Sequence, residues 1–503
     1  MDANSFNLAD FSSVVLILLA FIFYVVPYLL DSYDYRRRFP GPPLAGFTNW
    51  WMSCLIRTGR HSELVQQLHK KYGTFVRLGP NHISIADPEA LEVVYGHSLL
   101  KSEHYQVFQN GSKNDLFSVV DKEEHSKKRK RLAPIFSAQN SLTFEPRIRH
   151  HIRQLCAQWD LRCDEAARGV SGVNWGVRKG QAIIDVCSQF SYLAFDIIGD
   201  LALGSPFGLI QAQKDSSLVI ESIDAYGEPV RGTMEVPVAK TIVNLGIVGM
   251  SVGVFPSWAH QLSHYLPWNL SGFRDKLNFL KLTIASVDAK LKRGPRDGMV
   301  DGKQSVDIID KLLEVRDEDG NPLPIDELYA EAFLLLAAGS DTTSTALGSL
   351  CYHLAIHPEV QRQLQAELDQ LVPYGLSFEI SDKEDQTAPY DAIAQYDDVK
   401  NLPYLNACIK EALRINAPLA TGLPRVVPAG KTVTITGQTF KAGSVISIPS
   451  YTINQSSVWG NDAAEFRPER WLNDESNSLN KYFAPFSIGP RPVNLYLYVA
   501  FND

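Results

Sequence analysis

Apolar and polar positions alternate along most of this chain with the three-to-four-residue period of amphipathic helices. This period predicts helices over residues 61–72, 123–132, 145–166, 183–203, 324–350, 358–371 and 403–415. A two-residue period, typical of half-buried strands, is confined to residues 74–78, 82–86, 432–435 and 444–448. The pattern therefore indicates a mainly α protein with a small β subdomain.

Two apolar stretches have no polar face. Residues 225–270 lack a clear period, and we expect loops and short helices there, lying near a membrane surface. Residues 11–30 contain no charge, and at about 1.5 Å per residue a helix of this length spans a hydrocarbon core of about 30 Å. We therefore predict a transmembrane anchor at about 11–30. A cleaved signal peptide is the alternative, but residues 1–10 hold no Lys or Arg.

Charge and cysteine content narrow the function further. Arg36, Arg37 and Arg38 follow the apolar run, so the positive-inside rule places the body in the cytoplasm. The net charge of the 503 residues is -8, and no long basic face is evident, which argues against nucleic acid as a partner. The cysteines are Cys54, Cys156, Cys163, Cys187, Cys351 and Cys408. Their irregular spacing indicates buried thiols in a reducing compartment.

A run of small and hydroxylated residues lies inside the apolar helix predicted at 324–350. Ser and Thr compete for backbone carbonyls and Gly weakens a helix, so such a run needs compensation. One explanation is a break, in which Gly339 ends one helix and the next Ser or Asp begins another. The other is that Ala338 and Gly339 let a planar ligand approach the backbone. Asp341 and Thr342 would then supply an acid and an alcohol for proton delivery.

Glu411 and Arg414 stand three residues apart on the helix predicted at 403–415, so their side chains share a face. Such a pair is commonly exposed and contributes little. The apolar run 483–491 is broken by Gly489 and Pro490 and predicts a tight loop that packs against a planar group.

Four motifs together resemble the cytochrome P450 family. They are Ala-Gly-Ser-Asp-Thr-Thr at 338–343, Glu-x-x-Arg at 411–414, Phe-Arg-Pro-Glu-Arg-Trp at 466–471 and Pro-Phe-Ser-x-Gly-Pro-Arg at 485–491. The resemblance implies the cytochrome P450 fold, haem b with its iron, and a haem-dependent monooxygenase. It also implies electrons from an NADPH-cytochrome reductase, a flavoprotein, and a single-pass position in the endoplasmic reticulum membrane with a cytoplasmic catalytic body. Lysines of the 123–132 helix would form part of the face for that acidic partner.

The resemblance assigns roles to particular residues. It implies catalytic roles for Asp341 and Thr342, haem contacts from His125, Arg129, Ala338, Gly339, Arg425, Phe486 and Arg491, and a buried network of Glu411, Arg414 and Arg470 behind the haem. Cationic side chains suit the haem contacts because burying the two haem carboxylates requires positively charged partners.

One position departs from the family. Its cysteine ligand to iron falls at Val493 here, and no cysteine follows Cys408, so we predict no metal ligand and doubt haem binding by the chain as given. We divide the chain into an anchor at 1–38, a catalytic domain at 39–491 and a divergent tail at 492–503, after which the C-terminal part of the fold is expected to be missing. We expect the transcript to continue from Pro492 with Cys-x-Gly. The alternative is a non-catalytic, membrane-anchored remnant.

A finer resemblance joins the chain to the fungal benzoate para-hydroxylases. It rests on residues 77–81, 193–208, 422–428 and 447–453. It implies that one oxygen atom from O2 enters a small aromatic acid, such as benzoate, opposite the carboxylate. The expected pocket walls are residues 101–121, Ala337, Ala338 and residues 418–423, and no residue is assigned to the carboxylate.

Overall fold

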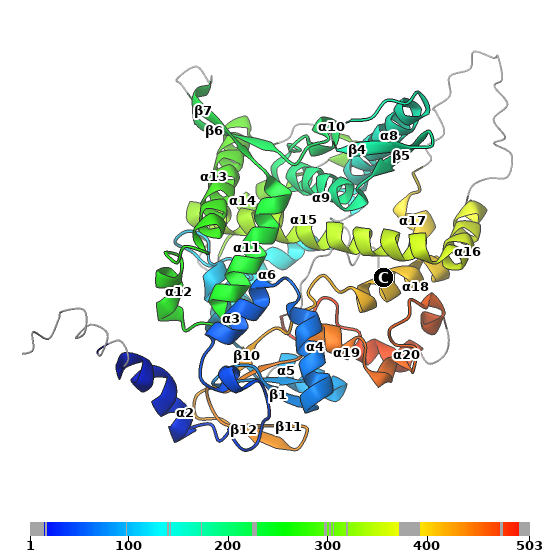
Figure 1. Ribbon diagram of the computed structural model, residues 1–503. Helices are drawn as coiled ribbons and strands as arrows, with labels where there is room; N and C mark the ends of the chain where they lie inside the picture. Colours follow the sequence, from blue (N-terminus) through cyan, green and yellow to red (C-terminus); the bar gives the residue numbers. More distant parts are fainter. Residues whose placement is uncertain are drawn as a thin grey trace, which may run out of the picture.

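The computed structural model describes residues 15, 18–96, 98–137, 140, 142–172, 174–223, 229–295, 299–300, 303–304, 306–317, 320–371, 393–472 and 476–491 (Figure 1). The predicted tail at 492–503, with Val493, lies outside these residues, as do parts of the predicted anchor.

Helices dominate the described chain, as the periodicity predicted. The α-helices are α2 (Val26–Leu30), α3 (Trp50–Arg57), α4 (His61–Tyr72), α5 (Leu91–Tyr95), α6 (Lys122–Leu132), α8 (Glu145–Ala167), α9 (Val186–Leu203), α10 (Leu209–Ala212), α11 (Val238–Gly253), α12 (Ser257–Ser263), α13 (Leu270–Arg293), α14 (Ile308–Glu314), α15 (Ile325–Ile356), α16 (Pro358–Leu368), α17 (Tyr396–Val399), α18 (Pro403–Ile415), α19 (Ser450–Ile453) and α20 (Ser476–Leu479). The predicted ranges 61–72 and 403–415 coincide with α4 and α18.

A small sheet forms the β subdomain. Its strands lie in the order β1 (Phe75–Arg77), β2 (His82–Ile85), β13 (Val445–Ser447), β10 (Arg425–Val426) and β3 (Leu100–Lys101). The predicted hairpin of β1 and β2 is present, and the β10–β3 pairing sets Arg425 opposite Lys101. The sheet thus places two cations from distant parts of the sequence side by side. The hairpins are β4 (Trp175–Arg178) with β5 (Gln181–Ile184), β6 (Ser217–Ile223) with β7 (Pro229–Val236), β8 (Met299–Val300) with β9 (Lys303–Gln304), and β11 (Val433–Ile435) with β12 (Gln438–Phe440).

The long helix α15 crosses the middle of the molecule, with α9 on one side and α18 on the other (Figure 1). Within the described chain, α9 is the one helix long and apolar enough to cross a membrane, yet about two thirds of it is buried. Leu201 and Leu203 of α9 and Leu336 of α15 belong to one hydrophobic core. The apolar side chains of α9 are thus those of a helix in the protein core, although Asp196 and Asp200 are buried in it too.

Three predictions need correction. The cysteines are not all buried thiols, because Cys408 is buried whereas Cys54, Cys156, Cys163 and Cys187 are exposed. Residues 225–270 do not consist only of loops and short helices, because α11 runs over sixteen residues. Its periodicity was hidden because nearly all of its faces are apolar. The basic helix α6 is not simply a solvated face: Lys128 is 3% exposed and its ammonium contacts Glu327 at 2.5 Å. This ion pair was invisible in the sequence, since the partners lie 199 positions apart.

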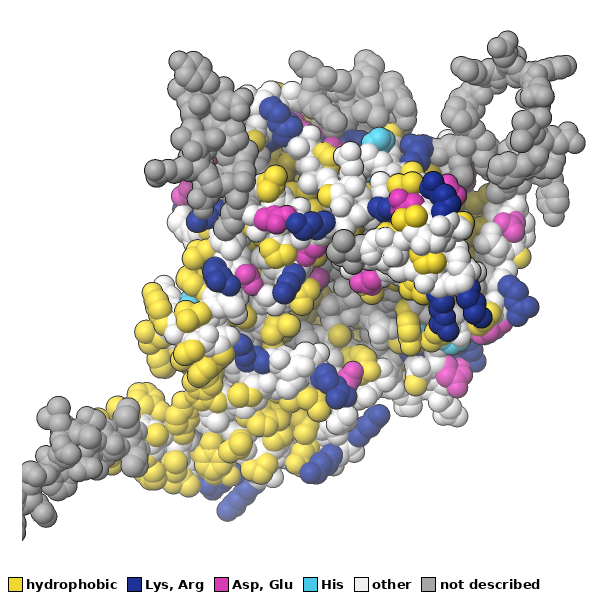
Figure 2. All heavy atoms as spheres, turned by 45° about the horizontal axis from the view of Figure 1, so that its top comes forward, with side chains coloured by type: hydrophobic (Ala, Val, Ile, Leu, Met, Phe, Trp, Pro, Cys, Tyr) yellow, Lys and Arg dark blue, Asp and Glu magenta, His cyan; other side chains and the backbone are white. Residues whose placement is uncertain are grey.

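Exposed apolar side chains gather near the N-terminal helix. Residues Leu18–Leu30 form a short apolar helix that projects from the body, and Phe23 and Leu30 are 62% and 71% exposed. In and just after α12, Trp258 and Tyr265 are 69% and 75% exposed. Figure 2 shows hydrophobic side chains spread over the end of the molecule from which this helix projects.

Candidate active site

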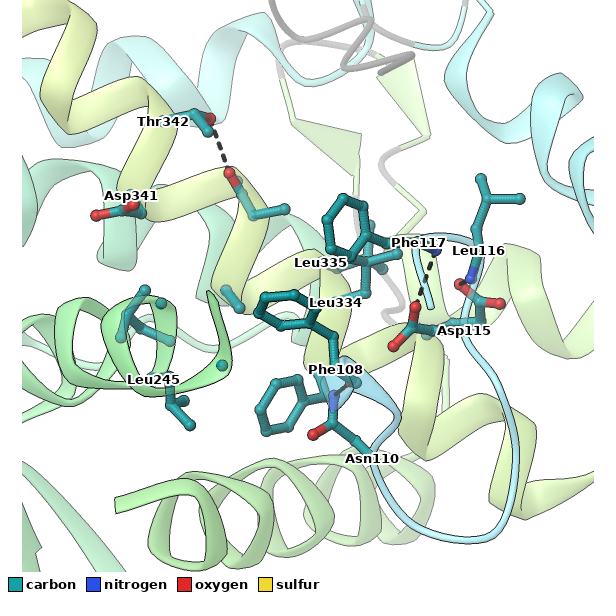
Figure 3. A pocket seen from close by; sticks show the side chains of 18 of the residues that line it. Phe108, Asn110, Asp115, Leu116, Phe117, Leu245, Leu334, Leu335, Asp341 and Thr342 are labelled. Carbon is teal, nitrogen blue, oxygen red and sulfur yellow. Dashed lines mark hydrogen bonds between the residues drawn. The ribbon is translucent and has the colours of Figure 1, made fainter. Parts of the chain in front are cut away.

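An apolar cavity of about 360 Å³ lies against α15. Its walls include Phe108, Phe117, Leu245 and Leu334, so most of its surface is hydrocarbon. Figure 3 shows Asp341 and Thr342 at one side of this space, with the segment that carries Asn110 and Asp115 at the other. The predicted pocket walls at 101–121, Ala337 and Ala338 contribute to the lining, and Leu419 does so from the predicted 418–423 wall.

The helix break considered for the small and hydroxylated run is absent, because α15 continues through it. Thr342 Oγ1 donates a hydrogen bond to Ala338 O one turn earlier, at 2.8 Å. Ser340 Oγ likewise donates to Leu336 O, at 2.6 Å. These bonds satisfy the hydroxyl groups within the helix and leave Thr342 with an oxygen beside the cavity.

Asp341 borders the cavity too. By surface area Asp341 is exposed, yet the protein atoms around its carboxyl remove enough water to raise its pKa above the usual range. A raised pKa makes the group better able to hold and release a proton near neutral pH.

Gly339 has a packing role as well as a place beside the cavity. A Cβ added to it would lie 3.2 Å from Ile198 Cδ1 and Cγ1 on α9. The glycine therefore lets α9 and α15 approach closely, whereas the sequence suggested either a helix break or the approach of a planar ligand. Ala338 and Gly339 both remain in the cavity wall.

Four basic side chains that were predicted to contact haem come together, of which His125 is neutral at neutral pH. His125 and Arg129 of α6 and Arg491 border the cavity, and Arg425 lies close enough for its charge to affect His125 and Arg491. Lys101, which the sequence analysis did not single out, is a fifth member. We call these residues the cation cluster.

The members of the cation cluster lower one another's pKa. Burial, followed by the charges of Arg491 and Lys101, lowers the pKa of His125 to about 3. Burial and Arg425 lower the pKa of Arg491 to about 10. Burial and the nearby arginines hold the pKa of Lys101 well below its usual value. Mutual repulsion of this kind indicates a place for a ligand with negative charge.

The loop at 483–491 is fastened to the cation cluster. Arg129 Nη1 donates to Pro490 O at 2.7 Å, and Arg491 donates to the carbonyls of Val119 and Val120 at 3.1 and 3.0 Å. Gly489 has φ +79°, and a Cβ there would lie 2.3 Å from the Tyr95 carbonyl oxygen, so glycine is required.

Phe486, predicted to contact haem, is half-buried in this loop. It is not among the described residues that border the cavity.

Glu411, Arg414 and Arg470 meet in the protein interior, where their exposed fractions are 0%, 0% and 3%. Arg414 donates to both carboxylate oxygens of Glu411 at 2.8 Å, and Arg470 Nε donates to Oε1 at 2.8 Å. Burial raises the pKa of Glu411, but the bonds and charges of the two arginines outweigh burial and lower it below its usual value. This is a buried network rather than the exposed pair that the spacing alone suggested.

The donor set fits one part of a haem and lacks another. The cation cluster suits two buried carboxylates, which are the charged groups of haem b. By contrast, no cysteine is among the described residues that border the cavity. Cys408 is buried elsewhere, in a cluster with Val360 and Phe466, and burial together with nearby Glu469 raises the pKa of its thiol to about 12. A thiolate is therefore disfavoured there.

We expect Arg491→Gln to weaken the binding of haemin to the purified chain by about tenfold, because one charge-assisted hydrogen bond to a carboxylate is lost. Titration of the haemin absorbance measures the affinity. Arg60→Gln, on an arginine with a 66% exposed side chain, is the matched control and should leave the affinity unchanged. Equal affinities for all three chains would show that the cation cluster does not bind the haem carboxylates.

A long helix that carries an acid and an alcohol beside an apolar cavity, next to a cluster of basic side chains, is the arrangement that the four motifs predicted. Residues 40–492 match the cytochrome P450 family, and the chain belongs to this family of monooxygenases. It is 35% identical over 489 residues to benzoate 4-monooxygenase bphA of Aspergillus niger, covering 96% of this chain and 88% of the relative. It is 28% identical over 459 residues to pisatin demethylase of Fusarium vanettenii, covering 90% and 80%.

A crystal structure of a cytochrome P450 shares the fold, with a TM-score of 0.63 and 21% identity, over 88% of this chain and 85% of that chain. The mainly helical fold with small sheets is therefore confirmed.

Proposed function

We propose that residues 40–491 form the substrate and proton-delivery apparatus of a haem-dependent monooxygenase that hydroxylates a small aromatic acid, such as benzoate, at the para position. The observation that carries this proposal is the apolar cavity bordered by Asp341 and Thr342 beside the cation cluster. The likeness to benzoate 4-monooxygenase supports the substrate class.

In this proposal, different residues bind the substrate and deliver the proton. Haem would supply the oxidising power for inserting one oxygen atom of O2 into a C–H bond, and the cation cluster would hold its carboxylates. The apolar walls hold an aromatic ring and exclude water. The raised pKa of Asp341 favours its protonated carboxyl more than in an ordinary aspartate, and Thr342 can pass a proton when its hydroxyl leaves the Ala338 carbonyl.

We also propose a membrane position. The exposed apolar helix Leu18–Leu30 and the exposed side chains Trp258 and Tyr265 favour contact with a lipid surface at one end of the molecule. The proposed site is the endoplasmic reticulum membrane, with the body in the cytoplasm. Lys122, Lys127 and Lys130 on the outer side of α6 would meet an acidic, NADPH-dependent flavoprotein reductase.

The second candidate function is a non-catalytic, membrane-anchored protein with the same fold. It is favoured by one feature of the sequence, Val493 at the position where the family resemblance places the cysteine. A chain with valine there has no thiolate for iron at this position, whatever the fit of the cation cluster.

The carbon monoxide spectrum of the reduced protein separates the two candidates. From the chain as given we expect no thiolate-type Soret band, because valine has no ligand atom. We expect that band when cysteine is restored at position 493 together with a full C-terminal continuation of the family. A thiolate-type band from the unaltered chain would contradict the non-catalytic candidate. If both chains lack the band, the proposed monooxygenase apparatus is wrong.

A further inference from the structure

Lys276 is a cation of the cavity wall that stands apart from the cation cluster. It lies on α13, borders the cavity and contacts the segment that precedes Asn110. Arg491 and Arg425 lower the pKa of Lys101 in the cluster, whereas Asp115 raises the pKa of Lys276 and also acts on Lys101. Because Lys276 lies on α13, which supplies no member of the cluster, the cavity has a second positive position.

The described residues hold the ammonium group of Lys276 in place but use only two of its three N–H donors. It donates to the backbone carbonyls of Val107 at 3.1 Å and Gln109 at 2.8 Å. An ammonium group has three donors, so one remains for a ligand. Carbonyls orient the group without neutralising its charge, as an arrangement for an anionic ligand requires.

The position of this segment defines the orientation of a ligand. Asn110 and Asp115 lie across the cavity from Asp341 and Thr342 (Figure 3). Lys276 is bonded to the carbonyl that immediately precedes Asn110 and therefore belongs to that far side. Phe108, Phe117 and Leu334 line the apolar space between the two sides.

Two acids lie on the same side, and among the described residues neither forms an ion pair with Lys276. Burial is the main reason that the pKa of Glu331 is raised to about 8, so this carboxyl is protonated at neutral pH. Asp115 Oδ1 accepts bonds from the backbone N–H groups of Phe117 and Ser118, at 2.9 and 2.6 Å. Burial lowers the pKa of Lys276 to about 8, which still leaves most of the ammonium charged at neutral pH.

We infer that Lys276 binds the carboxylate of the aromatic acid and turns the opposite ring carbon toward Asp341 and Thr342. This inference rests on the proposed function for the identity of the substrate as an aromatic acid. It assigns the carboxylate partner that the sequence left open, and it explains how a largely apolar cavity would select the para position.

The test compares a charged ligand with its neutral isostere. Equilibrium dialysis of the detergent-solubilised full chain measures the affinity for labelled benzoate and for labelled benzamide. For Lys276→Met we expect the benzoate affinity to fall by about tenfold to a hundredfold, because a charge-assisted bond is lost. The benzamide affinity should change by less than about threefold. Lys276→Arg keeps the charge and the donors and should retain the preference for benzoate.

Two control variants locate the effect. Lys281→Met alters an exposed lysine of the same helix and should change neither affinity. Arg491→Gln alters the cation cluster, the other place in the cavity where a carboxylate could bind. If Arg491→Gln abolishes benzoate binding and Lys276→Met does not, the carboxylate belongs to the cluster and the inference is wrong.

The remaining outcomes separate this inference from the proposed function. Equal losses of benzoate and benzamide in Lys276→Met would mean that Lys276 only fastens residues 107–109 to α13, which overturns the inference and leaves the proposed function standing. If the unaltered chain binds neither ligand, the proposed substrate class fails, and the inference fails with it. If Lys276→Met does not fold, the affinities of the unaltered chain and of Lys276→Arg for benzoate and benzamide are compared instead. If each of these chains binds the two ligands equally well, a contact between the carboxylate and residue 276 is excluded.

Discussion

Glu411→Ala should lower the free energy of unfolding by about 3–5 kcal/mol, the usual effect of removing one partner from a buried ion pair. The carboxylate accepts bonds from Arg414 and Arg470, and also from Trp471 Nε1 at 2.9 Å. Without it, two guanidinium groups that are at most 3% exposed keep their charge in the protein interior. Urea denaturation followed by circular dichroism measures the change.

The matched control is Glu63→Ala. Glu63 also has an arginine partner three residues away, Arg60, at 2.7 Å, but its side chain is 47% exposed. Water and salt screen this pair, so the expected loss is less than about 1 kcal/mol. Equal losses for the two variants would show that the burial of Glu411 does not make its pairing important for stability.

His125→Gln should make the protein less sensitive to acid. The pKa of His125 is about 3 in the folded chain, against 6.5 for a free histidine, because of burial and then Arg491 and Lys101. The unfolded chain takes up this proton first as the pH falls. The stabilisation from the neutral imidazole is therefore complete above about pH 6.5 and is lost as the pH falls toward 3. Removing it should reduce the decline in stability between about pH 6.5 and pH 4.5 by about 2–3 kcal/mol.

Urea denaturation at several pH values, with the variant beside the unaltered chain, measures this decline. The comparison is needed because Glu331, whose pKa is raised, contributes a pH dependence of opposite sign. His150→Gln, on an exposed histidine, should leave the decline unchanged. An unchanged decline in His125→Gln would mean that this imidazole is protonated in the folded chain.

The parts of the fold that the sequence predicted are those with local signals. The periods of α4 and α18 gave their bounds, because one face of each helix is polar. The family motifs placed Glu411 and Thr342 correctly on α18 and α15.

Other contacts depend on long-range folding and leave no local signal. Lys276 is an ordinary lysine in sequence, and its importance comes from carbonyls 167 and 169 positions away. The same reason hides Lys101, whose neighbours in the cation cluster come from α6, β10 and the 483–491 loop. Gly339 was interpreted through the motif alone, and its contact with Ile198 required the packing of α9 on α15.

The bond from Arg129 to the Pro490 carbonyl also constrains the order in which the protein folds. Its partners are 361 positions apart, so it forms only after a very large loop has closed. Contacts of such high sequence separation are entropically costly and tend to form late. The same holds for β3, which is held by its pairing with β10, also far away in the sequence. We therefore expect this side of the cavity, built from β3, α6 and the 483–491 loop, to be completed late in folding.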